Sequence, residues 1–188
     1  DIDGVITDET HPNNNVWHNA LCEFLGYNIK RIKESYYFDE AYGLSREIIT
    51  SFLLKYRTKI YSQAKIYEGA KDTLNYLNTK GFQIHLITAR EPEHRQLTAD
   101  WLKKYGIKYT ALYHEDNKTP LAVKKGIELF IEDNAENALK LSRENITVLL
   151  MNKYHNQGFK ENTNIIRVND WSDIRKEIFN FYSQSIPG

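Results

Sequence analysis

The chain has 188 residues, 41% of them hydrophobic, and its 25 basic residues balance its 25 acidic ones. This length predicts one domain, or one domain with an insert, and the neutral charge argues against duplex nucleic acid, whose binding needs a basic surface. The single cysteine excludes an internal disulfide and a cysteine-based zinc site. Without a signal peptide or an apolar run of about 18 residues, the sequence predicts a soluble, cytoplasmic protein that does not contact membranes.

The first residues, Asp1-Ile2-Asp3-Gly4, place two carboxylates two positions apart, directly before a glycine. If Asp1 ends a strand, both acids face the crevice at the carboxyl end of a parallel sheet, where such sheets bind ligands. Close carboxylates repel unless a cation or a proton separates them. The pair therefore predicts a Mg²⁺ site, a nucleophile beside a general acid/base, or both, with a polar turn as the alternative. Such a motif needs an apolar strand before it, so we expect a short segment of the natural protein to precede Asp1.

The next part of the chain is predicted to be a loop followed by helices. Residues 9–15 contain turn-forming residues, and residues 16–25 form a predicted helix that Asn15 caps and Gly26 ends. Residues 29–42 are predicted to be helical in parts, and another helix opens at Ser45, followed by apolar residues at helical spacing. Residues 13–66 are therefore predicted to be entirely helical, without a strand.

From residue 67 onward, short apolar strands alternate with helices. The predicted strands are 82–87, 109–113, 127–131, 146–151 and 164–168, and the predicted helices are 68–80, 92–105, 119–125, 135–142 and 171–182. This alternation predicts an α/β fold, a Rossmann-like parallel sheet with helices on both faces. The expected organisation is a core of residues 1–12 and 67–188, with residues 13–66 inserted after the first strand, above the crevice.

Polar residues follow three strands of the predicted core. Thr88-Ala89-Arg90 offers a hydroxyl and free amides to an anion, Glu132-Asp133 ends an apolar strand, and Lys118 precedes a short helix. Each has a structural alternative: a capping threonine, an N-cap acid, and a solvated lysine, with Lys124 competing for the same role. Because strand carboxyl ends share one edge of a parallel sheet, these groups are expected to converge with the two N-terminal aspartates.

The four sites, in this order, resemble the motifs of the haloacid dehalogenase-like (HAD) hydrolases. The matching residues are Asp1-Ile2-Asp3-Gly4-Val5, Leu86-Ile87-Thr88, Lys118 and Ile131-Glu132-Asp133. The predicted helical insert resembles the small helical cap of that family, so the resemblance covers most of the chain. Residues 36–43, 117–119 and 130–133 are most similar to the 5′(3′)-deoxyribonucleotidase group and its bacterial relatives. The chain departs from that group in having Glu132 before Asp133 and Thr-Ala-Arg after the second strand.

This resemblance implies a Mg²⁺-dependent phosphomonoesterase that works through an aspartyl-phosphate. Asp1 would be the nucleophile and Asp3 the general acid/base. The metal ligands would be Asp1, the Asp3 carbonyl and Asp133, with Glu132 directing a metal-bound water. Thr88, Lys118 and the amides of Gly4 and Ala89 would bind the phosphate.

The resemblance also implies a small phosphorylated substrate, with a nucleotide as the first candidate. Tyr36, Tyr37 and Phe38 are expected either to stack on a base or to fill the core of the helical segment. Trp17 is open to the same two interpretations, and Arg90 either contacts the substrate or pins its loop. The same chemistry on a sugar phosphate or a polynucleotide 3′-phosphate, and a non-catalytic binding protein, are the rival interpretations. A monomer and a homodimer are equally compatible with the sequence.

Overall fold

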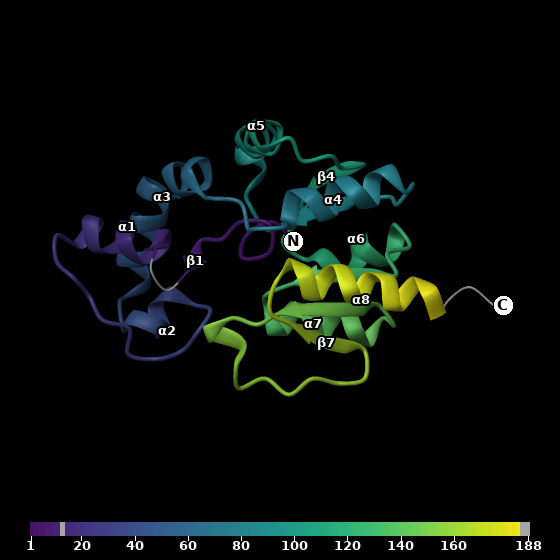
Figure 1. Ribbon diagram of the computed structural model, residues 1–188. Helices are drawn as coiled ribbons and strands as arrows, with labels where there is room; N and C mark the ends of the chain where they lie inside the picture. The colour runs from purple at the N-terminus through teal and green to yellow at the C-terminus, as the bar shows by residue number, and fades with distance from the viewer. Residues whose placement is uncertain (12–13, 185–188) are drawn as a thin grey trace.

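The core strands form two parallel sheets in the computed structural model, which describes residues 1–11 and 14–184 (Figure 1). In the first sheet β3 (His85–Thr88) pairs with β4 (Ala111–His114). In the second, β6 (Thr147–Met151) lies between β5 (Leu129–Glu132) and β7 (Ile165–Val168). Every strand pair of the core is parallel, as predicted. Helices join consecutive strands from β3 to β6, whereas a loop with one short 3₁₀ turn joins β6 to β7.

Helices cover both faces of the larger sheet. Side chains alternate along each strand, so successive apolar residues of β6 point to opposite faces, and both faces need a covering layer. Leu149 and Met151 belong to one hydrophobic cluster, which includes residues of α4 (Ala70–Thr79), α5 (Arg95–Tyr105) and α8 (Trp171–Gln184). Val148 and Leu150 belong to the other, with residues of α6 (Lys118–Lys124) and α7 (Ala135–Arg143). This two-faced core fixes the strand ends that carry the polar residues.

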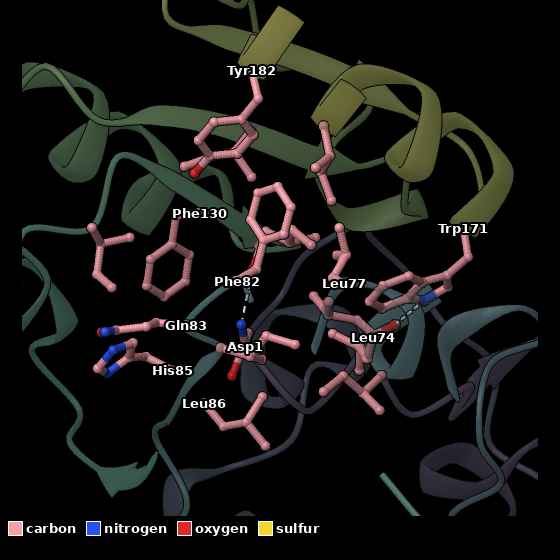
Figure 2. A pocket seen from close by; sticks show the side chains of 17 residues that line it. Asp1, Leu74, Leu77, Phe82, Gln83, His85, Leu86, Phe130, Trp171 and Tyr182 are labelled. Atoms are coloured by element: carbon pink, nitrogen blue, oxygen red, sulfur yellow. Dashed lines mark hydrogen bonds between the residues drawn. The ribbon is translucent and has the colours of Figure 1, made fainter. Parts of the chain in front are cut away.

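A mostly apolar cavity of about 120 Å³ lies beside Asp1 and is lined by residues of both sheets (Figure 2). Asp1 is not part of a strand, and its main-chain nitrogen donates to the carbonyl of Ile131 on β5 (2.8 Å). Residues 3–6 turn immediately afterwards. The indole nitrogen of Trp171 donates to the carbonyl of Val5 (2.9 Å) and fixes this turn against α8. Asp1 is thereby held beside the end of β5.

The segment between the first turn and α4 has its own hydrophobic core. Its helices are α1 (Val16–Leu25), α2 (Phe38–Tyr42) and α3 (Arg46–Gln63), and its core includes Leu21, Phe52 and Ile60. The predicted bounds of α1 are confirmed, since the Asn15 side chain accepts from the His18 amide and Gly26 ends the helix at φ 78°. Figure 1 shows these helices gathered beside the sheets, next to the N-terminal turn.

The prediction that residues 13–66 are entirely helical was wrong in part. The short strands β1 (Thr10–His11) and β2 (Asn14–Asn15) pair antiparallel, and β2 lies inside the range predicted to be entirely helical. Two-residue strands are too short to show the alternation that identifies a strand. Residues 29–42 are helical in part, as predicted: they contain α2, and a main-chain bond from the Ile32 amide to the Ala41 carbonyl folds the residues before this helix back as a loop.

Smaller shifts affect the core elements. The strand predicted at 82–87 begins at His85, since Phe82 still bonds back to the end of α4. The helix predicted at 92–105 opens as a 3₁₀ turn, η1 (Pro92–His94), and a second such turn, η2 (Tyr154–Asn156), follows β6. Lys118 is the first residue of α6 and not a loop residue. None of these shifts moves the polar residues that follow the strands away from the edge where the carboxyl ends of the strands lie.

The two chain crossings between the helical segment and the core lie side by side. Thr7 and Ile66 form an antiparallel bridge. The Asp8 amide donates to the Lys65 carbonyl, and the Tyr67 amide donates to the Ile6 carbonyl, both at 2.8 Å. The paired crossings hold the helical segment against the edge where the strands end. No described helix is long and apolar enough to cross a bilayer.

Candidate active site

Three predicted site residues meet at the carboxyl end of β5. Carboxylate oxygens of Asp1, Glu132 and Asp133 all lie within 4.8 Å of one another. Glu132 is the last residue of β5 and Asp133 follows it, while the bond from Asp1 to Ile131 sets the position of Asp1. The predicted convergence of residues from opposite ends of the core therefore occurs, because the strand end and the N-terminal turn are tied together.

Lys118 lies between two of these acids. Its ammonium group is 2.7 Å from Asp1 Oδ2 and 2.8 Å from Glu132 Oε2, and its side chain is 2% exposed. Lys124 is exposed on the same helix, so of the two candidate lysines it is Lys118 that contacts the acidic cluster. Burial alone would raise the pKa of Glu132, but the Lys118 ammonium and the Asn134 amide outweigh it and lower that pKa.

Asp3 faces a different partner. Nε and Nη2 of Arg90 both donate to its carboxylate, the former at 2.9 Å from Oδ2 and the latter at 2.5 Å from Oδ1. Burial raises the pKa of Asp3, yet the charge of Arg90 outweighs this effect and holds the pKa below its usual range. The sequence left open whether Arg90 contacts the substrate or pins its loop. In the structure it binds Asp3.

Glu9 is a buried acid that sequence reasoning did not identify. The Thr7 hydroxyl and the Trp17 indole nitrogen both donate to its carboxylate, and the side chain lines the same cleft as Asp3. Burial and the neighbouring charge of Asp3 raise the pKa of Glu9 well above its usual value. A lone glutamate in a polar loop carries no pattern that separates it from a solvated residue.

A cleft of about 400 Å³ opens between the acidic cluster and the helical segment. Tyr36 and Tyr37 line it, and each residue is about half exposed. The Tyr36 ring meets the His155 ring edge-on at 5.2 Å, and the Tyr37 hydroxyl donates to Glu136 (3.3 Å). His155 in turn lies 3.1 Å from the Asp133 carbonyl, which joins this side of the cleft to the acidic cluster.

The aromatic run divides between the two roles considered for it. Phe38 also lines the cleft, but its ring packs against Trp17, Tyr42 and Phe52, with centroids 5.6–6.0 Å apart. Trp17 likewise lines the cleft while packing against Phe52 and Tyr61. Phe38 and Trp17 thus belong to the core of the helical segment and close one wall of the cleft, whereas Tyr36 and Tyr37 project at its mouth.

The loop after β3 borders the cleft. Ala89 lines it and is exposed. Thr88 is fully buried, and its hydroxyl accepts from the Arg90 amide (3.3 Å). The role of these two residues and of Gly4 in phosphate binding stays a prediction.

Gly4 approaches the acidic cluster more closely than any other residue type could. Its φ is +72°, and a Cβ added there would lie 2.3 Å from Asp133 Oδ2. Positive φ favours glycine in any case, and here a side chain would also displace a carboxylate of the site.

We expect Gly4→Ala to lower the phosphomonoesterase activity that the sequence resemblance implies much more than it lowers stability. Both Gly4→Ala and the control Gly26→Ala impose alanine on a left-handed backbone, at φ +72° and +78°, a strain of about 1 kcal/mol. Nothing lies within 4 Å of a Cβ at Gly26, so only Gly4→Ala displaces Asp133. Phosphate release and melting temperature are measured for both variants. Equal losses of activity in the two would show that the close approach to Asp133 is unimportant.

The donor set fits a hard divalent cation. The three clustered side chains offer only carboxylate oxygens, the ligands that Mg²⁺ prefers. Lys118 neutralises one of the three negative charges, so the cluster keeps an excess of negative charge to attract a cation. Within the described residues, this is the one group of three or more candidate ligands that converges in this way.

Comparison with known proteins places this geometry in context. Residues 40–163 match the family model described as HAD superfamily, subfamily IIIB (acid phosphatase). A nucleotidase from Clostridium acetobutylicum is 32% identical over 177 residues, covering 93% of this chain and 88% of that protein. YqfW of Bacillus subtilis, whose name also describes a nucleotidase, is 29% identical over 179 residues, covering 91% and 87%. A haloacid dehalogenase-like hydrolase from Streptococcus pneumoniae superposes with a TM-score of 0.63 at 14% identity, covering 96% and 95%, which confirms the predicted fold class.

Proposed function

Because the chain belongs to the HAD superfamily of hydrolases and is an enzyme of the phosphatase and nucleotidase type, we propose that it hydrolyses nucleoside monophosphates through an aspartyl-phosphate with the help of Mg²⁺. The observation that carries this proposal is the placement of Asp1 beside Lys118, Glu132 and Asp133, with Asp1 and Asp133 lining a cleft. The nucleotidase names of two relatives support the substrate class.

In this proposal Asp1 attacks the phosphorus atom of the substrate. One of its oxygens accepts from the Ile2 amide (2.7 Å) and the other from Lys118, which orients the carboxylate. Asp3 gives a proton to the departing alkoxide and later takes one from the water that hydrolyses the intermediate. Lys118, with amides of the N-terminal turn and of the loop after β3, stabilises charge on the phosphoryl oxygens.

A Mg²⁺ ion would be held by Asp1, Asp133 and the Asp3 carbonyl, with Glu132 behind them. When bound, the ion would neutralise charge on the phosphate and so weaken its repulsion of the nucleophile. The buried Lys118–Glu132 pair fixes the Glu132 carboxylate and leaves Asp133 facing the cleft.

Residues 13–66 act in this proposal as a cap that closes over the phosphate and reads the rest of the substrate. Tyr36 and Tyr37 supply exposed rings at the mouth of the cleft, and aromatic rings stack on nucleobases for about 1–3 kcal/mol per base. Phe38 packs against Trp17 and Phe52 in the core of the segment and does not itself need to touch the base.

The proposal is tested by phosphate release from a panel of phosphomonoesters, with and without Mg²⁺. The panel holds ribo- and deoxyribonucleoside 5′- and 3′-monophosphates and several sugar phosphates. We expect turnover that requires Mg²⁺ and prefers nucleotides. Turnover of sugar phosphates alone would remove the base-reading role of Tyr36 and Tyr37 while keeping the chemistry.

Metal binding is tested separately from turnover. At about 100 times its Kd, a ligand that binds only the folded state adds about 2.7 kcal/mol of stability, which corresponds to a rise in melting temperature of about 5–10 °C for a chain of this size. We expect this rise with Mg²⁺, its loss on adding a chelator, and a much smaller rise in the Asp133→Asn variant. A melting temperature that ignores Mg²⁺, with no turnover of any substrate, would favour a non-catalytic protein.

A further inference from the structure

The guanidinium nitrogens of Arg90 form hydrogen bonds with other residues of the protein and do not serve the cleft. Its side chain has no exposed surface, although the residue borders the cleft. Nε and Nη2 bind the Asp3 carboxylate side by side, the paired geometry in which a guanidinium fixes both the position and the plane of a carboxylate. A phosphate group reaching Arg90 would have to displace Asp3 from this pairing.

Other residues fix the guanidinium of Arg90 in turn. Its carbon lies 4.0 Å from the centre of the Tyr61 ring, on α3, and Nη1 donates to the hydroxyl of the fully buried Thr98 on α5 (3.3 Å). The backbone of Arg90 is fixed as well, since its amide bonds to Thr88 and its carbonyl lies 2.9 Å from Nδ1 of His114. Arg90 therefore has little freedom to move when a substrate binds. Its fixed guanidinium in turn sets the orientation of the Asp3 carboxylate.

We propose that Arg90 is a positioning residue that holds the Asp3 carboxyl group in the orientation from which it exchanges protons with the leaving group and with water. The inference rests on the proposed function, in which Asp3 is the acid/base. Asp3 takes up a proton when the negatively charged phosphate binds beside it, because a nearby negative charge disfavours the ionised carboxylate. In the first step the bond between phosphorus and the ester oxygen breaks, and this proton moves to that oxygen. A misplaced Asp3 slows this transfer, because proton transfer requires the two heavy atoms to be within hydrogen-bond reach.

The choice of leaving group separates positioning from other roles. A nucleoside alkoxide is a strong base that needs the proton as it leaves, whereas 4-nitrophenolate is stable without one. Removing the support of Asp3 should therefore slow nucleoside monophosphates far more than 4-nitrophenyl phosphate. A residue that binds the phosphate, or that only stabilises the fold, affects both substrates alike because both carry the same phosphoryl group.

The experiment compares Arg90→Lys with the wild-type protein in Mg²⁺, using first-turnover release of nucleoside and of 4-nitrophenol. We expect the rate of nucleoside release to fall about 10²–10³-fold, the lower part of a general acid's contribution, and that of 4-nitrophenol to fall less than about tenfold. Arg175→Lys, an exposed arginine on α8, is the matched control and should leave both rates unchanged. Melting temperatures establish that each variant is folded.

A second variant keeps Arg90 but removes one of the contacts that fix its guanidinium. Thr98→Val removes the hydroxyl that accepts from Nη1 and should give the same selective loss on nucleoside release, about three- to tenfold. Equal losses on the two substrates in Arg90→Lys, or a loss that appears only in KM, would overturn the inference while leaving the proposed function intact. A wild-type protein that hydrolyses neither substrate would overturn the proposed function itself, and this inference with it.

Discussion

Asp1→Asn is expected to remove steady-state phosphate release, with a loss on the order of 10³-fold or more, as replacement of a covalent nucleophile does in other hydrolases. The amide is not a nucleophile, so the residue cannot form the aspartyl-phosphate. The substitution also removes the charge that Lys118 meets at 2.7 Å and one carboxylate of the cluster with Glu132 and Asp133. The two effects act on the same step, so no residual route through Asp1 remains.

The measurement is phosphate release from the best substrate of the panel, at saturating Mg²⁺. Asp100→Asn makes the same change on an exposed side chain of α5 and should keep full activity. Acid quenching during turnover should trap a phosphorylated protein with the wild type and none with Asp1→Asn. Sustained turnover by Asp1→Asn would overturn the covalent mechanism, whatever the identity of the substrate.

The sequence was informative about this site wherever sheet topology decides the outcome. Glu132 and Asp133 follow an apolar strand, and a parallel sheet brings all its strand ends to one edge. Their meeting with Asp1 could therefore be predicted without knowing a single distance. The fold class could be predicted for the same reason, because alternating strands and helices leave few ways to cover both faces of a sheet.

Partner choice could not be predicted, because it depends on side chains that tertiary packing brings together. Lys118 and Lys124 lie on one short helix, yet only Lys118 turns inward to Asp1 and Glu132. Arg90 carries no signal that selects Asp3 over a substrate phosphate. Glu9 gives no pattern at all, since its burial results from the helical segment folding over it.

The three consecutive aromatic residues of the helical segment show the same limit of prediction from sequence, here between neighbours in the chain. Tyr36, Tyr37 and Phe38 are consecutive, and the sequence left two roles open for all three, stacking on a base and filling the core of the helical segment. In the structure the chain enters α2 at Phe38, which turns that ring into the segment's core. Tyr36 and Tyr37 precede the helix and stay half exposed. Three neighbours therefore take different environments because a helix begins between them.

Lys118→Met is expected to destabilise the folded protein as well as inactivate it. Methionine is close to lysine in length but carries no charge, so the variant leaves the carboxylates of Asp1 and Glu132 buried without their ammonium partner. Removing one member of a buried ion pair costs about 3–5 kcal/mol, a large part of the 5–15 kcal/mol by which domains are typically stable. Urea unfolding measures the loss, and Lys124→Met, an exposed control on the same helix, should change stability by less than about 0.5 kcal/mol.

The origin of that loss can be separated from a packing defect with a second substitution. Glu132→Gln removes one of the two carboxylates that face Lys118 (2.8 Å). If unpaired charge causes the instability, the double variant Lys118→Met/Glu132→Gln should be more stable than Lys118→Met alone, because the two changes involve groups in direct contact and are not additive. Activity should not return in the double variant, since the ammonium group that faces Asp1 is still missing. Additive losses of stability would mean that Lys118 contributes through its packing, and recovery of activity would mean that its charge is not needed for phosphoryl transfer.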